Sequence, residues 1–296
     1  MFERRYFIVA QNFHGTTLLS KLLNDHPEVV SLGDTYPSNL FDQTCGCGKL
    51  VSQCQFWKVV SDDVGADRYR SYPHLLPDYP PVFGGKVDRV LYNGLRPKRL
   101  ARLMPTDSRE NFAKDFGIFE ESVFRNAGQP NARVFVDGVK SISRVYALIA
   151  AGVRVDGVIH LQRDPSDFIK STTKQQGKTW SMFFSRLLTY RLFHKLARRT
   201  AGWVPYRSVT YEGLAADPNG TLEDLFRFVG VDTCTIDELI SQQSQPPWHF
   251  MGNASLFYFD GTIRRSQHKI SKWEQSLVRF IGGKYDMKKK HLQGWP

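Results

Sequence analysis

The strongest constraint on the fold is an alternation of short apolar runs with longer stretches of helical periodicity. Runs rich in Val, Ile and aromatic residues predict strands at 6–10, 28–32, 133–137, 157–162 and 206–211. The intervening stretches predict helices at 16–24, 142–151, 165–175, 180–202 and 221–229. Strands that alternate with helices form a parallel sheet covered on both faces. The sequence therefore predicts an α/β fold with a central parallel sheet flanked by helices.

The domain organisation follows from length and from one region of different composition. The chain has 296 residues, which suits one large domain, so we expect a single domain over 1–296. Residues 46–129 are rich in Pro and Gly, and we expect them to form an irregular or helical insertion, or lid, on the sheet. The C-terminal tail, 282–296, is basic.

Charge limits the classes of partner. The net charge of +11 suits a charged cofactor, an acidic glycan, a nucleic acid or a membrane surface. No basic–aromatic motif supports nucleic-acid binding, so none is predicted. The predicted helix at 180–202 carries several Arg and Lys residues and cannot lie in lipid. No cleavage site follows the first strand. We expect a cytoplasmic protein, with peripheral membrane contact left open and the oligomeric state undetermined.

Three cysteines lie close together in the sequence "CGCGKLVSQC", at Cys45, Cys47 and Cys54, while Cys234 is distant. A structural zinc site usually has four ligands. The pattern favours a Gly-rich turn with small buried thiols, and a zinc clip or a disulfide stays open. No metal is predicted in the functional site.

The stretch "FIVAQNFHGTTLL", residues 7–19, reads as a strand, a loop and a helix. Gly15 allows the backbone to turn tightly, and the free N–H groups of Thr16, Thr17 and Leu18 would then point at an anion. The Walker pattern GxxxxGKS/T is absent, so hydrolysis of a nucleoside triphosphate is not predicted. On this loop alone, a plain strand-to-helix turn is an equal interpretation.

A second strand, turn and helix occurs in "VIHLQRDPSDFIKS", residues 158–171. Arg163 ends the strand, Asp164 suits the N-cap of the helix and Pro165 suits its first position. Ser171 follows about two turns later. A fixed cation and a hydroxyl can together hold a second phosphate. The alternative is that Arg163 pairs with a surface carboxylate.

Together these segments resemble the sulfotransferases that use 3′-phosphoadenylyl sulfate (PAPS). "FHGTT" and "RDPSDFIKS" match that family's K/R-S-G-T-T and RDPRD…S segments in order and spacing. "VFVDGVKSISR" is similar to the VDSSKxxxR element of the bacterial and Golgi-type branch, and "CGCGKLVSQCQFW" to the CSCGxxxxxCxFW stretch of bacterial members. "TYEGLAADPNGTLEDLFRFVGV", "HFMGN" and "IRRSQHKISKW" resemble further family segments, so the likeness covers residues 6–273.

The resemblance implies a P-loop-NTPase-like sulfotransferase fold, with PAPS as sulfuryl donor, PAP as product and no required metal. The sulfuryl group would pass by in-line displacement to a hydroxyl of a small-molecule, lipid or carbohydrate acceptor, and the insertion at 46–129 would cover the acceptor side. The implied nucleotide contacts are His14, Gly15, Thr16, Thr17 and Leu18 at the 5′ end, Arg163 and Ser171 at the 3′ phosphate, and also Tyr211, Asn253, Arg264 and Arg265.

The chain departs from the family pattern at the loop. Phe13 stands where the family has Lys or Arg, and His14 where it has Ser. Negative charge develops on the bridging oxygen as PAP leaves, so another cation is needed. Lys140 matches a family lysine, and we expect it to be the main cation. We expect His14 to assist as a cation or N–H donor, a neutral loop histidine with one hydrogen bond being the alternative.

The general base is predicted from the residues after the second strand. Asp34 follows Gly33 where this branch has Gly-Glu, so it would accept the proton of the acceptor hydroxyl. The alternative is that Asp34 caps the turn before Tyr36. Two other functions compete with the enzyme: a protein that binds PAP or an acidic glycan without catalysis, and a P-loop kinase. The missing Walker lysine argues against the kinase, and the acceptor itself cannot be read from the sequence.

Overall fold

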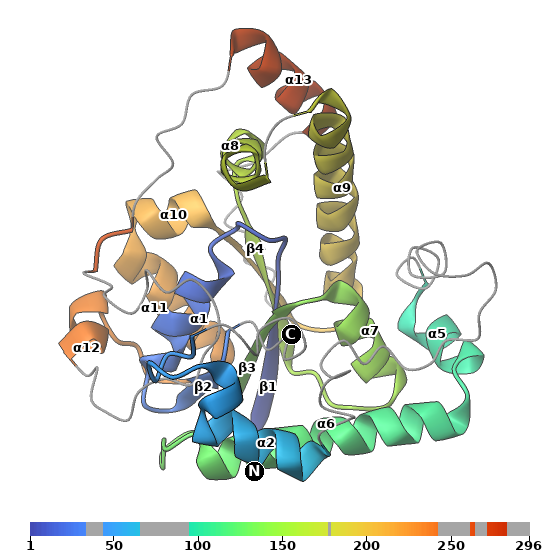
Figure 1. Ribbon diagram of the computed structural model, residues 1–296, viewed down its shortest axis with the longest axis vertical. Helices are drawn as coiled ribbons and strands as arrows, with labels where there is room; N and C mark the ends of the chain where they lie inside the picture. Colours follow the sequence, from blue (N-terminus) through green and yellow to red (C-terminus); the bar gives the residue numbers. More distant parts are fainter. Residues whose placement is uncertain (34–43, 66–94, 177–178, 242–260, 264–270, 283–296) are drawn as a thin grey trace.

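The computed structural model describes residues 1–33, 44–65, 95–176, 179–241, 261–263 and 271–282 (Figure 1). Within these ranges, a five-stranded sheet has the order β2-β3-β1-β4-β5, and every neighbouring pair is parallel. The strands are β1 (Arg4–Val9), β2 (Val29–Ser31), β3 (Val134–Lys140), β4 (Gly157–Gln162) and β5 (Tyr206–Thr210). The predicted α/β class, with a parallel sheet flanked by helices, is confirmed.

The helices connect and cover these strands. They are α1 (Thr16–Asn24), α2 (Gln55–Val64), α5 (Pro97–Leu103), α6 (Thr106–Asn126), α7 (Ile142–Ala150), α8 (Pro165–Gln176), α9 (Trp180–Arg199), α10 (Tyr211–Ala216), α11 (Pro218–Val229), α12 (Ile236–Ser241) and α13 (Lys272–Gly282). Short 3-10 turns lie at Val51–Gln53 and Thr200–Gly202. No helix among the described residues is long and apolar enough to cross a membrane.

Two helix ends differ from the sequence prediction by more than one residue, for local reasons. The helix predicted at 180–202 ends at Arg199, because its last three residues tighten into the 3-10 turn. The helix predicted at 221–229 begins earlier, at Pro218. There the Asp217 carboxylate accepts a hydrogen bond from the Gly220 N–H at 2.9 Å, and Pro218 fills the first helical position.

The core consists of two layers, one on each face of the sheet. On β1, Tyr6 and Ile8 pack with the leucines of α1 and α11, whereas Phe7 and Val9 face the opposite way. This second layer includes Trp57 of α2, aromatic residues of α6 and several apolar residues of α7. Successive strand side chains point to opposite faces, so both faces of the central strand are buried.

The described part of the predicted insertion at 46–129 belongs to this core. Trp57, Phe116 and Phe119 are almost completely buried against the sheet. Figure 1 shows α2 and α6 beside the N-terminus, at the far end of the molecule from α8 and α13. These two helices are therefore structural and do not cover the ends of the strands where β4 meets α8. Residues 66–94 of the insertion and 283–296 of the tail lie outside the described residues.

A third apolar cluster joins α8, α9 and α13. Its buried members are Phe168, Ile169, Phe183, Leu187, Tyr190 and Val278. In Figure 1, α8 and α13 stand beyond the carboxyl end of β4, on the side away from the N-terminus, and α9 runs from there down beside the sheet. The carboxyl ends of the central strands are therefore partly enclosed by helices.

Candidate functional site

The strand order creates a crevice at the carboxyl ends of β1 and β4. These strands are neighbours, but the connection after β1 leads to β2 on one side of the sheet and the connection after β4 leads to β5 on the other. Ligands of open α/β sheets bind where adjacent connections leave in opposite directions. Both predicted phosphate segments, 10–15 and 163–165, lie at this point.

The loop after β1 presents backbone donors at the start of α1. Gly15 is the N-cap residue, with φ of 89°, and no side chain caps the helix. A Cβ on Gly15 would lie 2.5 Å from Cδ2 of Tyr211, so any larger residue would also clash with the Tyr211 ring. The first-turn N–H groups of Thr16, Thr17 and Leu18 are therefore not taken by a capping side chain, and the helix dipole favours an anion there.

Arg163 connects the two segments that are predicted to bind phosphate. Its Nη1 donates a hydrogen bond to the carbonyl oxygen of Phe13 at 2.5 Å, and its guanidinium lies 4.8 Å from the ring centroid of Tyr211. The residue is only 9% exposed, and no carboxylate in the described ranges forms an ion pair with it. A surface ion pair, the alternative considered for Arg163, is thus not seen among these residues. A buried guanidinium that has no ion-pair partner among the described residues is costly, which favours an anionic ligand beside it.

The start of α8 has the predicted local structure. The Asp164 carboxylate accepts hydrogen bonds from the N–H groups of Ser166 at 2.8 Å and Asp167 at 3.4 Å, as an N-cap residue does. Pro165 is the first helical residue, and Ser171 lies further along α8, partly exposed. The cap fixes the start of α8 and hence the position of Arg163 between the end of β4 and this helix.

A chain of buried histidines lies behind the loop. His14 Nδ1 is 3.1 Å from the carbonyl oxygen of Asn12, and His14 Nε2 is 3.2 Å from Nε2 of His194 on α9. His194 Nδ1 lies 2.7 Å from Nε2 of His160 on β4, and His160 Nδ1 lies 2.5 Å from the hydroxyl of Tyr206 on β5. The chain of hydrogen bonds therefore links the phosphate loop to α9 and to two strands.

The hydrogen-bond partners determine the tautomers along this chain. A carbonyl oxygen only accepts, so His14 carries its proton on Nδ1 and its Nε2 accepts from His194. His194 must then accept on Nδ1 from the His160 Nε2–H, and His160 accepts on Nδ1 from the Tyr206 hydroxyl. Every ring is neutral and uses both nitrogens.

This geometry corrects the cationic and donor roles predicted for His14. The side chain is completely buried, and burial lowers its pKa to about 3, an effect that Arg163 and Lys140 reinforce. Burial also lowers the pKa values of His160 and His194 well below their usual range. His14 is neutral, and its single N–H is used by Asn12, so it supports the loop from behind. The sequence alternative, a neutral loop histidine, describes it better, and His160 is a core residue as expected.

Phe13 and Lys140 share an unusual backbone conformation. They are the two non-glycine residues with positive φ among the described residues, at 66° and 72°. Such a conformation costs roughly 1–2 kcal/mol for an L-residue. Lys140 ends β3 beside Val9 of β1, so both strained residues lie at the carboxyl ends of neighbouring strands. Strain of this kind concentrates at functional sites, where the surrounding structure maintains it.

Lys140 and Phe13 also face a common cavity of about 400 Å³. Its walls come from the loop after β1, the end of β3, and the helices α8 and α9. Aromatic and aliphatic side chains alternate there with cations and hydroxyls; the lining residues are Ala10, Gln11, Asn12, Phe13, Lys140, Ser141, Ile142, Ser143, Phe168, Thr172, Arg186, Phe193 and Leu196. A pocket of this size and mixed lining can hold a small organic ligand next to the Lys140 ammonium.

The element around Lys140 is held by a buried ion pair. The Arg144 Nη2 lies 2.9 Å from the Asp137 carboxylate, with both side chains almost fully buried. The Arg144 guanidinium also lies over the ring of Phe116, 5.6 Å from its centroid. The Asp and Arg of "VDGVKSISR" therefore have a structural role, whereas Lys140 and the three residues that follow it line the cavity.

The residue before Asp34 lies close to the end of β3. A Cβ on Gly138 would be 2.5 Å from the carbonyl oxygen of Gly33, so the two backbones are in contact. Asp34 itself lies outside the described residues, as do Asn253, Arg264 and Arg265. Their predicted roles stay predictions.

Three residues of the site on α9 were not found from the sequence. The Tyr190 hydroxyl donates to the Arg163 carbonyl at 2.7 Å, His194 joins the histidine chain, and Arg186 lines the cavity. They are spaced four residues apart, so they follow one another along one side of the helix. That spacing was a usable signal, because the neighbouring Phe183 and Leu187 are buried and share the inward face.

Comparisons with known proteins agree with this architecture. No protein-family model matches the sequence, and no curated protein sequence matches it either. Among solved structures, the chain is similar to a sulfotransferase domain from the Synechococcus PCC 7002 olefin synthase, with a TM-score of 0.52 and 14% identity over 96% of this chain and 95% of that one. It is also similar to a sulfotransferase domain from the curacin biosynthetic pathway, with a TM-score of 0.50 and 11% identity over 97% and 99% of the two chains. The chain therefore has the fold of these sulfotransferase domains.

Proposed function

We propose that the protein is a sulfotransferase that moves a sulfuryl group from PAPS to a hydroxyl of a small-molecule, lipid or carbohydrate acceptor. The observation that carries the proposal is the buried Arg163 guanidinium. It has no carboxylate partner in the described ranges and contacts the loop that starts α1. A nucleotide with a phosphate at each end of its ribose would satisfy both the loop N–H groups and this cation. The shared fold supports the same assignment.

In the proposed reaction, the acceptor oxygen attacks sulfur and forms a new S–O bond while the bond from sulfur to the bridging oxygen breaks. PAP leaves with that electron pair, and the acceptor proton passes to a base. We assign the base to Asp34, since Gly33 lies against Gly138 of β3. We assign the cation for the leaving oxygen to Lys140, which ends β3 and lines the cavity. The same cavity is the proposed acceptor pocket.

The decisive experiment measures PAP binding by calorimetry in the presence of a metal chelator. Binding in the micromolar range or tighter is expected, because the donors are protein groups and no metal is needed. Arg163→Ala should weaken PAP binding by about 10–100-fold, the loss of one charge-assisted contact. It should weaken binding of adenosine 5′-phosphosulfate less, since that ligand has no 3′ phosphate.

The matched control is Arg207→Ala. Arg207 also lies over an aromatic ring, 5.6 Å from the centroid of Phe228, but near the start of β5 and so at the opposite end of the sheet. This variant should bind PAP like the parent chain. Binding of ATP with magnesium but not of PAP would refute the proposal in favour of a kinase.

A second function, PAP binding without catalysis, is favoured by one observation. The loop offers no cation of its own, because Phe13 is apolar and His14 is neutral and buried. Labelled PAPS and a panel of hydroxylated acceptors separate the two functions. Transfer to any acceptor supports the enzyme, whereas tight PAP binding without transfer or hydrolysis supports the binding protein.

A further inference from the structure

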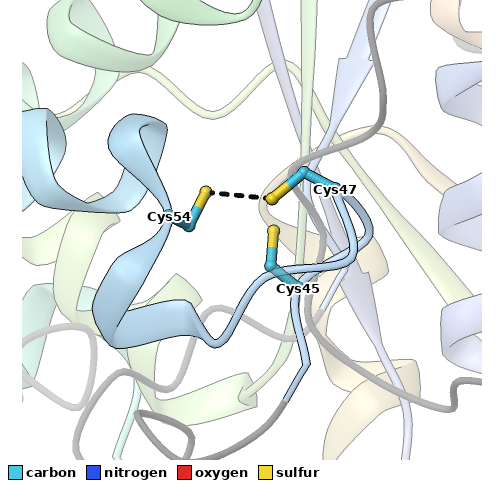
Figure 2. Close-up of side chains that lie close together, drawn as sticks. All are labelled: Cys45, Cys47 and Cys54. Atoms are coloured by element: carbon cyan, nitrogen blue, oxygen red, sulfur yellow. Dashed lines mark hydrogen bonds between the residues drawn. The ribbon is translucent and has the colours of Figure 1, made fainter.

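Three cysteine side chains converge next to α2, in a region that the proposed transfer reaction does not use. Cys45 and Cys47 lie in a tight turn closed by the bridge between Thr44 and Leu50, and Cys54 is the N-cap residue of α2. Figure 2 shows the three sulfur atoms directed toward one another from the turn and from the helix end. The sequence allowed three interpretations of this cluster: buried free thiols, a disulfide or a zinc clip.

The distances distinguish these alternatives. The three Sγ atoms all lie within 4.8 Å of one another, and Cys47 Sγ is 3.6 Å from Cys54 Sγ. A disulfide requires about 2.05 Å, and none is formed. Thiolates at about 2.3 Å from a tetrahedral zinc ion are separated by about 3.8 Å. The distance between the Cys47 and Cys54 sulfurs is therefore close to the spacing of two sulfurs around one ion, and Cys45 Sγ lies within 4.8 Å of both.

The surroundings also hold two of the three sulfurs away from water. Cys45 and Cys54 are completely buried within the core, whereas Cys47 is partly exposed. The turn is held independently of the sulfurs, because the Cys45 N–H donates to the Lys49 carbonyl at 2.8 Å and the Gly48 N–H donates to the Cys45 carbonyl at 2.9 Å. The positive end of the α2 dipole at Cys54 favours the negative charge of a thiolate.

We propose that Cys45, Cys47 and Cys54 bind one divalent metal ion with thiophilic character, zinc in the first place. Binding would convert three thiols to thiolates and release three protons, giving a site with net charge −1 and one tetrahedral position left for water. All-sulfur ligation selects zinc over magnesium or calcium, which prefer oxygen.

The role we assign to the ion is structural. It would fix the turn at 44–50 to the start of α2, whose Trp57 is buried in the core layer under β1 and β3. None of the three cysteines belongs to the proposed nucleotide site, so the metal proposal does not depend on the proposed sulfuryl transfer. Loss of the ion should lower stability without removing the groups that bind PAP.

The test uses the full chain, expressed without a metal-binding tag and purified under reducing conditions. Elemental analysis should find close to one zinc ion per chain, and replacement by cobalt should give the thiolate-to-cobalt charge-transfer absorption of a sulfur-ligated site. Cys47→Ser should abolish both signals. Cys47 is partly exposed, so this change removes a ligand without opening a large cavity in the core.

Cys234→Ser is the matched control, since Cys234 is also partly exposed but lies outside the cluster, and it should keep both signals. If Cys47→Ser does not fold, a thermal melt of the parent chain with and without a strong zinc chelator replaces it, and the chelator should lower Tm. The proposal is overturned if the reduced parent chain retains no zinc and gives no cobalt absorption, or if its mass shows the loss of two hydrogens expected for a disulfide.

Discussion

The histidine chain behind the phosphate loop makes a sharp prediction for His194→Phe. Phenylalanine keeps a ring in the space of His194, which is almost fully buried against Tyr190, but it cannot form hydrogen bonds. The His14 Nε2 acceptor and the His160 Nε2–H donor both lose their partner. Each unsatisfied buried group costs roughly 1–3 kcal/mol, so the variant should lose about 2–6 kcal/mol of unfolding free energy.

His26→Phe is the matched control for this experiment. His26 is equally buried, also uses both ring nitrogens, with Asp232 and Glu28, and packs against an aromatic ring. It follows the C-terminal end of α1, whereas the phosphate loop precedes the N-terminal end about 14 Å away. The two variants should lose similar stability in urea titrations, for the same physical reason.

Only His194→Phe should affect the nucleotide site. The His14 ring holds the loop in its strained conformation. Loss of its hydrogen bond to His194 should therefore weaken PAP binding by about tenfold, because ordering the loop on binding would then cost ~1.4 kcal/mol. Calorimetry with PAP on both folded variants measures this. Parent-like PAP affinity in His194→Phe, or an equal loss in His26→Phe, would refute a role of the chain in holding the loop.

Three further predictions concern pH, the loop glycine and the catalytic pair. The three hydrogen-bonded histidines, His14, His160 and His194, are neutral in the folded protein and bind protons when it unfolds. The free energy of unfolding should therefore be full above pH ~6.5 and fall as the pH drops toward 3, by up to about 1.4 kcal/mol per pH unit for each histidine. A flat pH profile of urea midpoints would contradict this. Gly15→Ala and Gly152→Ala carry similar strain at φ of 89° and 81°, roughly 1–2 kcal/mol, but only the first meets Tyr211, so only it should weaken PAP binding strongly. In transfer assays, Lys140→Ala should lower turnover by about 10²–10³-fold and Asp34→Asn by about 10²–10⁴-fold, with smaller changes in PAP affinity; parent-like turnover in either variant would remove its assigned role.

The local elements of this protein could be predicted from its amino-acid sequence. Helix α1 and strand β4 have the predicted bounds, because leucines at helical spacing and a continuous apolar run report burial over a few neighbouring residues. The Asp164 cap and the Gly15 turn were also predicted, since each depends on the preferences of one or two residues. The local structure of the two segments predicted to bind phosphate could therefore be read from the chain alone.

How these segments meet depends on long-range packing. The strand order brings β4 next to β1, which allows Arg163 to reach the carbonyl of Phe13, 150 residues earlier. His14 has its partner His194 at a separation of 180 residues, and burial at this position lowers the pKa of the ring, contrary to the cationic role predicted for it. The convergence of Cys54 with the turn at 44–50 likewise depends on how α2 packs. Composition and periodicity record burial, but charge state and contact depend on long-range packing, which no local pattern encodes.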